Sequence, residues 1–259
     1  LVDLSQNLFE EIPELPSTIF AVVYNYNKIK FFNPFLPNVH HLFCSMNQIS
    51  TFKSGLAFSY LLTLDLSMNK ITSDHIPSFR MVAPSLQKLD LSYNQLTLFP
   101  DLPSSLRELN LNHNDIMLIP DIDSILPSLD ILKATNNLIE TVGKLPTALS
   151  SAYLSENRIK NMAICNLEKL QNLQLHCNEL EDPPKLGAVQ VKDVFLMSNK
   201  LKSFDLEDNN TPKDQQIVKQ MPTIFDPTVL SKINLSDNNL EKINPNLFDL
   251  PNLIYLNVE

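Results

Sequence analysis

Residues 86–96 read Leu86-Gln87-Lys88-Leu89-Asp90-Leu91-Ser92-Tyr93-Asn94-Gln95-Leu96. Apolar residues stand eight, five and three positions before Asn94 and two positions after it, which gives the frame L-x-x-L-x-L-x-x-N-x-L. An Asn in this frame, strict in some copies and looser in others, stands at Asn7, Asn27, Asn47, Asn69, Asn94, Asn114, Asn137, Asn157, Asn178, Asn199 and Asn238. The chain is therefore made of internal repeats, and their period decides the fold.

The spacing between successive frame Asn residues is 20 to 25 residues, except for 39 between Asn199 and Asn238. Within each frame the L-x-L alternation has the period of a β-strand, so its two leucines point inward and the residue between them points outward. One repeat is too small to bury its own leucines. Parallel stacking, with one strand per repeat, buries them in a continuous column.

Over its whole length the chain resembles the leucine-rich repeat proteins. The resemblance implies an α/β-type solenoid, a horseshoe with a parallel concave β-sheet and a mostly irregular or short-helical convex side. It also implies that the frame Asn side chains hydrogen-bond the backbone where the chain leaves the strand, a structural role. The 20-residue copies resemble the compact repeats of bacterial effectors and protist proteins, whereas the longer copies resemble ordinary eukaryotic repeats.

The return path between strands leaves little room for helices, because a repeat has only about 20 residues. Prolines after the strand turn favour extended segments, and they are Pro13, Pro100, Pro120 and Pro183. In the 25-residue copy, residues 73–82 are long enough for one or two helical turns, with Ser73 or Asp74 as the N-cap.

The long spacing before Asn238 predicts an insertion at about residues 205–226. Within it, Thr211 as N-cap, Pro212 at the first helical position and Pro222 beyond the end predict a short helix. We expect residues 1–259 to form a single array of about eleven full repeats and one partial repeat. Because both ends fall within a strand frame, we expect this array to be a segment of a longer protein.

Composition excludes several classes of function. With 20 Lys and Arg against 29 Asp and Glu, the net charge of −9 disfavours nucleic acid as a partner. No apolar run approaches the length of a membrane span, so membrane insertion is not expected. The chain has only 3 Gly, and no Gly-rich phosphate-binding loop occurs. We therefore expect no cofactor.

Catalytic and metal sites are not expected either. The three cysteines form no CxxC pair and lack any recognisable catalytic signature, and the five histidines lack zinc spacing. Cys44 occupies an inward leucine position, Cys165 lies in a linker, and Cys177 directly precedes a frame Asn. So few cysteines favour a reducing compartment.

Exposed aromatic and Met side chains on the concave sheet are the candidate binding residues, because such residues anchor protein interfaces. Adjacent repeats are expected to gather one group, and a second group follows in later repeats. The first group is Val23, Tyr26, His41, Phe43, Met46 and Met68, and the second is Tyr153, Phe195 and Met197.

The sequence thus predicts a non-catalytic, cytoplasmic protein-interaction scaffold. Its concave sheet, and the 205–226 insertion as a second element, would hold a protein partner of unknown identity. Two alternatives stay open: a structural component of a large ciliary or cytoskeletal assembly, and the targeting segment of a multidomain signalling enzyme. A secreted protein is disfavoured, because the cysteine-rich caps of extracellular relatives are not visible.

Overall fold

The computed structural model describes residues 1–163, 165–185, 190–204, 228–243 and 245–259. The predicted insertion at 205–226, with its helix at 211–222, lies outside the described residues. The chain forms two compact units. Unit 1 comprises Leu1–Met117 and Ser124–Asn137, and unit 2 comprises Leu118–Asp123 and Leu138–Glu259.

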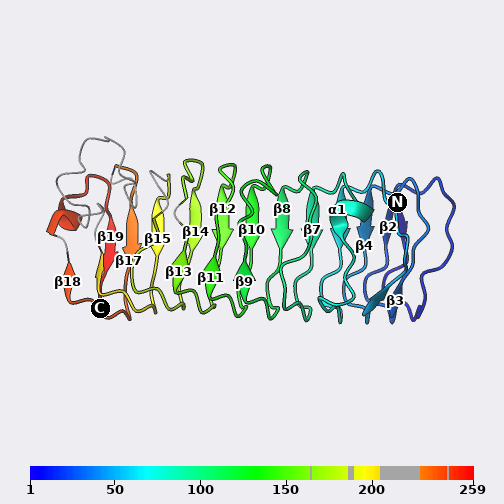
Figure 1. Ribbon diagram of the computed structural model, residues 1–259, viewed down its shortest axis with the longest axis horizontal. Helices are drawn as coiled ribbons and strands as arrows, with labels where there is room; N and C mark the ends of the chain where they lie inside the picture. The colour runs from blue at the N-terminus through cyan, green and yellow to red at the C-terminus, as the bar shows by residue number, and fades with distance from the viewer. Residues whose placement is uncertain (164, 186–189, 205–227, 244) are drawn as a thin grey trace. The chain divides into compact units, whose positions relative to one another are not determined.

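Both units are stacks of coils in which each repeat contributes one short strand to a parallel sheet (Figure 1). The sheet strands of unit 1, in spatial and chain order, are β1 (Val2–Asp3), β2 (Ala21–Val23), β4 (His41–Phe43), β6 (Thr63–Asp65), β7 (Lys88–Asp90), β8 (Glu108–Asn110) and β10 (Ile131–Lys133). Those of unit 2 are β12 (Ser151–Tyr153), β14 (Asn172–Gln174), β15 (Asp193–Phe195), β17 (Lys232–Asn234) and β19 (Tyr255–Asn257). The predicted leucine-rich repeat solenoid is confirmed.

The register between neighbouring sheet strands follows from the repeat frame. Val22 pairs with Leu42 and Leu42 with Leu64, so equivalent inward positions stand side by side in neighbouring strands. All three are at most 1% exposed. Cys44 lies two residues after Leu42 and is fully buried, as its place in the frame predicted. These inward columns form the core of each unit.

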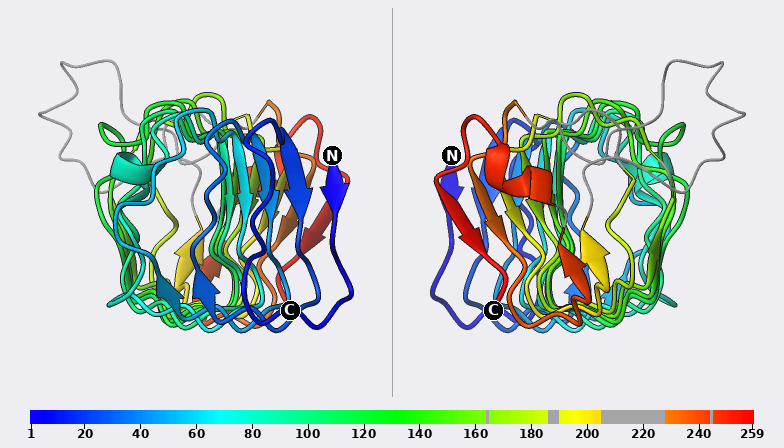
Figure 2. Two further views of the ribbon diagram at one scale, coloured as in Figure 1. Left: turned by 90° about the vertical axis from the view of Figure 1, so that its right-hand side faces the viewer. Right: turned by 90° about the vertical axis from the view of Figure 1, so that its left-hand side faces the viewer.

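The return side of the coils, opposite the sheet strands in Figure 2, contains short paired strands where the sequence predicted irregular or helical chain. In unit 1, β3 (Phe31–Phe32) pairs with β5 (Thr51–Phe52). In unit 2, β11 (Thr141–Val142) lies between β9 (Leu118–Ile119) and β13 (Asn161–Met162), and β16 (Ser203–Phe204) pairs with β18 (Lys242–Ile243). Stacking of the coils brings equivalent return segments side by side, so their amides and carbonyls pair.

Helix is scarce among the described residues. One turn, α1 (Phe79–Val82), falls inside the predicted 73–82 range, and a 3₁₀ helix, η2 (Pro245–Asp249), lies in unit 2. The predicted N-cap was wrong: Ser78 precedes the helix, without a side-chain capping bond. Ser73 has another role, because its Oγ accepts hydrogen bonds from the amides of Thr97 and Leu98 in the next repeat, both 2.9 Å.

The frame Asn residues form the expected ladder, and Asn94 shows the pattern. Its Nδ2 donates to the carbonyl of Leu91 in its own repeat and to that of Leu66 in the preceding repeat, both 3.0 Å. Its Oδ1 accepts from the amide of Ile71, also in the preceding repeat, at 3.0 Å. A buried amide side chain is therefore satisfied entirely by backbone groups, which confirms its structural role.

Candidate protein-interaction surface

The exposed side of the sheet strands in unit 1, here called the sheet face of unit 1, carries half the residues of the first predicted group. Side chains alternate along β4, so Leu42 points into the core while His41 and Phe43 lie half-buried on the opposite side. Val23 pairs with Phe43 across β2 and β4. The structure thus brings Val23, His41 and Phe43 together.

The other three predicted residues of this group, Tyr26, Met46 and Met68, do not lie on strands. Each stands in the turn after a sheet strand, directly before the ladder Asn, with a left-handed backbone. Their side chains are exposed, with values of 52%, 36% and 42%. In the next two repeats Tyr93 and His113 occupy the same turn position, with ring centroids 4.1 Å apart. We call these five residues the turn stripe.

A third aromatic group, which the sequence did not predict, lies before the sheet strands of unit 1. The rings of Phe20 and His40 stack with their centroids 4.2 Å apart. The ring of Tyr60 also stacks with His40, at a centroid distance of 5.8 Å. Phe20 also contacts His41 edge-on at 5.4 Å. The sequence did contain a signal for this group: Phe20 and His40 stand one position before a strand, and Tyr60 stands three positions before the next one. All three lie outside the L-x-L frame. Aromatic groups therefore flank the sheet face at both ends of its strands.

Two carboxylates lie on the next two strands after Phe43, on the same sheet face. Asp65 pairs with Phe43 on one side and with Asp90 on the other. Both line a hollow of about 220 Å³, with Phe43 at one end and Lys133 at the other. The hydroxyl of Ser67 donates to Oδ1 of Asp65 at 2.7 Å.

Burial raises the pKa of the Asp65 carboxyl, hydrogen bonds from Ser67 oppose this shift, and the negative charge of Asp90 adds to it. The folded carboxyl thus holds its proton more tightly than the unfolded one. Ionised Asp65 consequently destabilises the fold above its folded pKa, and this penalty disappears as the pH falls through that pKa.

We predict that Asp65→Asn stabilises the protein at pH 7. The Asn Oδ1 keeps the hydrogen bonds from Ser67, as Asn110 does for Asn112 in an equivalent position, while the buried charge is removed. Thermal unfolding should show a Tm higher by about 1–3 °C at pH 7, and the gain should shrink toward pH 3.5. In Asp3→Asn no gain is expected, because hydrogen bonds from Ser5 lower the pKa of Asp3. A gain that is independent of pH would contradict the electrostatic cause.

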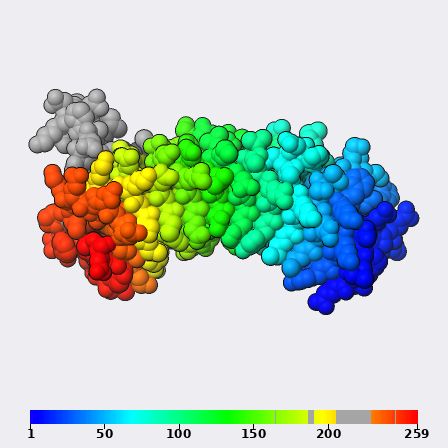
Figure 3. Space-filling view, turned by 90° about the horizontal axis from the view of Figure 1, so that it is seen from below, coloured from blue at the N-terminus to red at the C-terminus, as the bar shows by residue number. Residues whose placement is uncertain are grey.

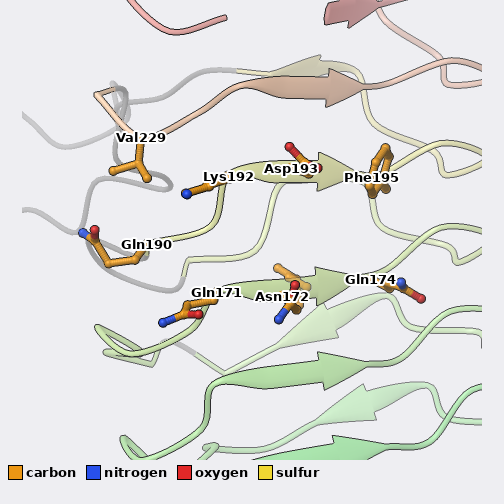
Figure 4. Close-up of a pocket in the computed structure, with 9 residues that line it drawn as sticks. Gln171, Asn172, Gln174, Gln190, Lys192, Asp193, Phe195 and Val229 are labelled. Carbon is orange, nitrogen blue, oxygen red and sulfur yellow. The ribbon is translucent and has the colours of Figure 1, made fainter. Parts of the chain in front are cut away.

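The second predicted group lies in unit 2. Tyr153 and Phe195 each pair with Gln174, from opposite sides, so a strand separates the two rings. Met197 follows two residues after Phe195, and its sulfur accepts a hydrogen bond from Nδ2 of Asn234 at 3.1 Å. Phe195 borders a hollow of about 490 Å³ (Figure 4), which is lined mainly by polar side chains such as Gln171, Asn172, Gln174 and Asp193.

Chemistry-bearing groups are sparse elsewhere. Cys44 and Cys165 are buried and Cys177 is exposed, and all three are free thiols. Burial raises the pKa of the Cys44 and Cys165 thiols, which disfavours thiolate chemistry. Among the described residues, no three His, Cys, Asp or Glu side chains gather as a metal site. In the same residues, no helix has the length and apolarity to cross a membrane.

Comparison with known families matches the repeat frame directly. Two models of the leucine-rich repeat fit this chain, one over residues 85–106 and the other over 59–74 and 103–116. The first match contains the whole frame around Asn94, residues 86–96. The chain is a leucine-rich repeat protein. No curated protein sequence matches it.

Solved structures resemble this leucine-rich repeat protein over nearly its whole length. All of it superposes on 50% of YopM from Yersinia enterocolitica WA-314, with a TM-score of 0.78 and 23% identity. YopM from Yersinia pestis, a leucine-rich effector protein, gives a TM-score of 0.61 and 23% identity over 98% of this chain and 64% of that one. The chain thus spans about half to two thirds of these relatives.

A third similar structure is the leucine-rich repeat part of FLRT2, in an octameric complex with Latrophilin 3 and Unc5D. It gives a TM-score of 0.58 and 22% identity over 95% of this chain and 76% of that one. At such identities the likeness shows the fold. Leucine-rich repeats commonly mediate protein–protein interaction and are generally non-catalytic binding modules.

Proposed function

We propose that this leucine-rich repeat protein is a non-catalytic scaffold that binds a protein partner through the sheet face of unit 1 and the adjoining turns. The observation that carries the proposal is the gathering of exposed aromatic and Met side chains there. The proposed contact residues are Val23, Tyr26, His41, Phe43, Met46 and Met68. Aromatic and Met side chains are enriched at protein interfaces, where they give large apolar contact areas.

The surroundings of these residues support the same role. The carboxylate of Asp65 adjoins Phe43 and that of Asp90 lies one strand further on, so the surface combines an apolar anchor with charge that can orient a partner. FLRT2, whose repeats share this fold, is part of a complex with other proteins. Three free thiols favour a cytoplasmic location, where thiols stay reduced.

Tyr153, Phe195 and Met197 of unit 2 form a proposed second contact. Phe195 supplies an aromatic wall to the hollow of about 490 Å³, and the amide side chains that line it offer both donors and acceptors. This surface is more polar than that of unit 1, so we expect it to add specificity more than affinity.

The test is affinity purification with crosslinking from native extract, comparing wild type with Phe43→Ser. We expect Phe43→Ser to lose a discrete protein that wild type recovers, because the variant removes the central ring of the surface. Circular dichroism should show that the variant remains folded, since Asp, Asn and Lys occupy the same position in other strands.

Phe35→Ser is the matched control. Phe35 is 78% exposed and lies on the return side, after β3, so its loss should leave recovery unchanged. Equal recovery by wild type and Phe43→Ser would contradict the proposal for unit 1. Loss with Phe195→Ser alone would then move the contact to unit 2.

A further inference from the structure

The turn stripe of unit 1 stands out against the same position in other repeats. Among the residues that the structure describes, eleven turns have a left-handed residue directly before the ladder Asn. In unit 2 the residues there are small or polar, namely Glu156, Cys177, Ser198 and Asp237. In unit 1 five consecutive repeats carry large side chains instead, namely Tyr26, Met46, Met68, Tyr93 and His113. These turns follow the downward-pointing sheet strands of Figure 1, and Figure 3 looks onto that edge from below.

The left-handed backbone has a structural cause that does not involve the side chain. The amide of Tyr26 donates to the carbonyl of Ser45 in the next repeat at 3.0 Å, and that of Met46 donates to Ser67 at 3.1 Å. The conformation thus continues the parallel ladder through the turn. Gly, Asn and Asp adopt it most easily, whereas Met and Tyr are unfavourable there.

The large side chains of the stripe therefore work against local backbone preference. They do not fill the core either, because Tyr26, Met68 and Tyr93 are 42 to 52% exposed. The left-handed backbone is common to all these turns, so the size and exposure of the side chains are what distinguish the stripe. A contact with another molecule accounts for both the size and the exposure of these side chains.

The spacing of the stripe selects the shape of its occupant. Neighbouring parallel strands lie about 4.8 Å apart, so the five side chains extend over about 19 Å. One turn of an α-helix rises about 5.4 Å, and a helix of about 14 residues is about 21 Å long. Same-face residues of an extended strand lie about 6.6 Å apart. Successive helical turns thus match successive repeats, and an extended peptide does not.

Charged residues on the two sides of the turn stripe determine which charges the two flanks of that helix should carry. Asp65 and Asp90 lie three residues before Met68 and Tyr93, on the sheet face, within about 10 Å of chain. On the other side Lys28 and Lys70, both exposed, follow Tyr26 and Met68 by two residues. Lys88 is paired with Glu108 at 2.7 Å, so this pair adds little net charge. Asp115 is the exception, beyond His113 at the end of the stripe.

We propose that the turn stripe is the docking site for an amphipathic α-helix of the protein partner. Apolar residues of that helix pack on Tyr26, Met46, Met68 and Tyr93. Basic residues along one flank face Asp65 and Asp90, and acidic residues along the other face Lys28 and Lys70. Because opposite flanks have opposite charge, the helix binds in one direction only. This inference rests on the proposed function and specifies the chemistry of the partner.

The test uses a displayed library of peptides of about 14 residues, with Leu at helical spacing and Lys, Glu, Gln or Ala at the flanking positions. The library is selected on the wild-type chain and counter-selected on the double variant Met46→Asn/Met68→Asn. We expect selected peptides to carry Lys on one flank and Glu on the other. Their Kd for the double variant should be at least about tenfold larger than for wild type.

Asn is chosen because it accepts the left-handed conformation and occupies the same position at Asn136. The Tm of the double variant should therefore equal or exceed that of wild type, which separates lost binding from lost folding. Met81→Asn is the control, since Met81 is 76% exposed on α1, away from the stripe. It should leave the Kd unchanged.

Three results would overturn the inference: no enrichment of peptides, enriched peptides without the charge pattern, or equal affinity of the peptides for wild type and the double variant. Self-association of the chain that the double variant abolishes would also overturn it, because the occupant would then be a second copy. If the native partner is lost with Phe43→Ser but retained by the double variant, the proposed function stands and the docking of a helix on the stripe does not.

Discussion

Replacing a central ladder residue, in Asn94→Ala, is expected to lower the free energy of unfolding by about 3–5 kcal/mol. Asn94 is 8% exposed, and its side chain donates to three carbonyls, those of Leu66, Leu91 and Ser92. It also accepts from the amide of Ile71. Ala leaves these buried groups without that partner, and the site is too enclosed for bulk water to replace it. Urea denaturation followed by circular dichroism measures the change.

Asn7→Ala provides the matched control. Asn7 holds the same ladder position, but it is exposed, and its Nδ2 donates to the carbonyls of Leu4 and Ser5 at 3.1 and 3.0 Å. Water can take over these bonds, so we expect a loss below about 1 kcal/mol. Equal losses in the two variants would show that burial does not determine the strength of the ladder.

Gly143→Ala is expected to lower the free energy of unfolding by about 2–3 kcal/mol. A Cβ at this position would lie 2.5 Å from the carbonyl carbon of Pro120 and 2.6 Å from the amide nitrogen of Asp121. These are backbone atoms of the neighbouring return segment in unit 2, so they cannot turn away as a side chain would. The amide of Gly143 also donates to Ile119 at 2.8 Å, which holds the two segments together. Thermal and urea unfolding measure the loss.

Gly55→Ala separates crowding from backbone conformation. Gly55 has a φ of +73°, and no heavy atom lies within 4 Å of its added Cβ. Only the left-handed backbone then opposes Ala, and we expect a loss of about 1 kcal/mol. A larger loss at Gly55 than at Gly143 would contradict the close approach between the two return segments.

The spacing of the repeats predicted the strands and their parallel stacking, and the resemblance to leucine-rich repeat proteins implied the Asn ladder. Val22, Leu42 and Leu64 occupy equivalent frame positions, and each is buried as predicted. Cys44 was also placed correctly, since an inward position accepts any compact apolar side chain. Repetition makes each local inference reinforce the next, which is why the fold emerged without long-range information.

The return side could not be predicted as well, because its residues follow no fixed frame. Pairing of Phe31–Phe32 with Thr51–Phe52 depends on two return segments of equal length lying side by side. The helix cap at residues 73–78 failed for a similar reason. Ser73 bonds amides of the next repeat, and a single repeat read by itself does not reveal that partner.

Among candidate binding residues, the sequence identified Val23, His41 and Phe43 as neighbours, and the structure places them so. It did not distinguish them from Tyr26, Met46 and Met68, whose position in a left-handed turn becomes visible only with the backbone. Phe20 and Tyr60 were missed, because they precede the strands and carry no frame position.

The Asn ladder has a direction. From Asn27 onward, each ladder Asn bonds the repeat before it, as Asn69 does through the carbonyl of Cys44 and the amide of Ile49. During synthesis the ribosome releases repeats in chain order, at about 1–4 s per repeat. A nascent repeat stays incomplete until the following Asn emerges, so the growing chain always carries one open turn at its newest end. Removing repeats from the N-terminus, by contrast, leaves no remaining turn without the Asn of the repeat that follows it. Folding on the ribosome therefore advances in the same direction as translation.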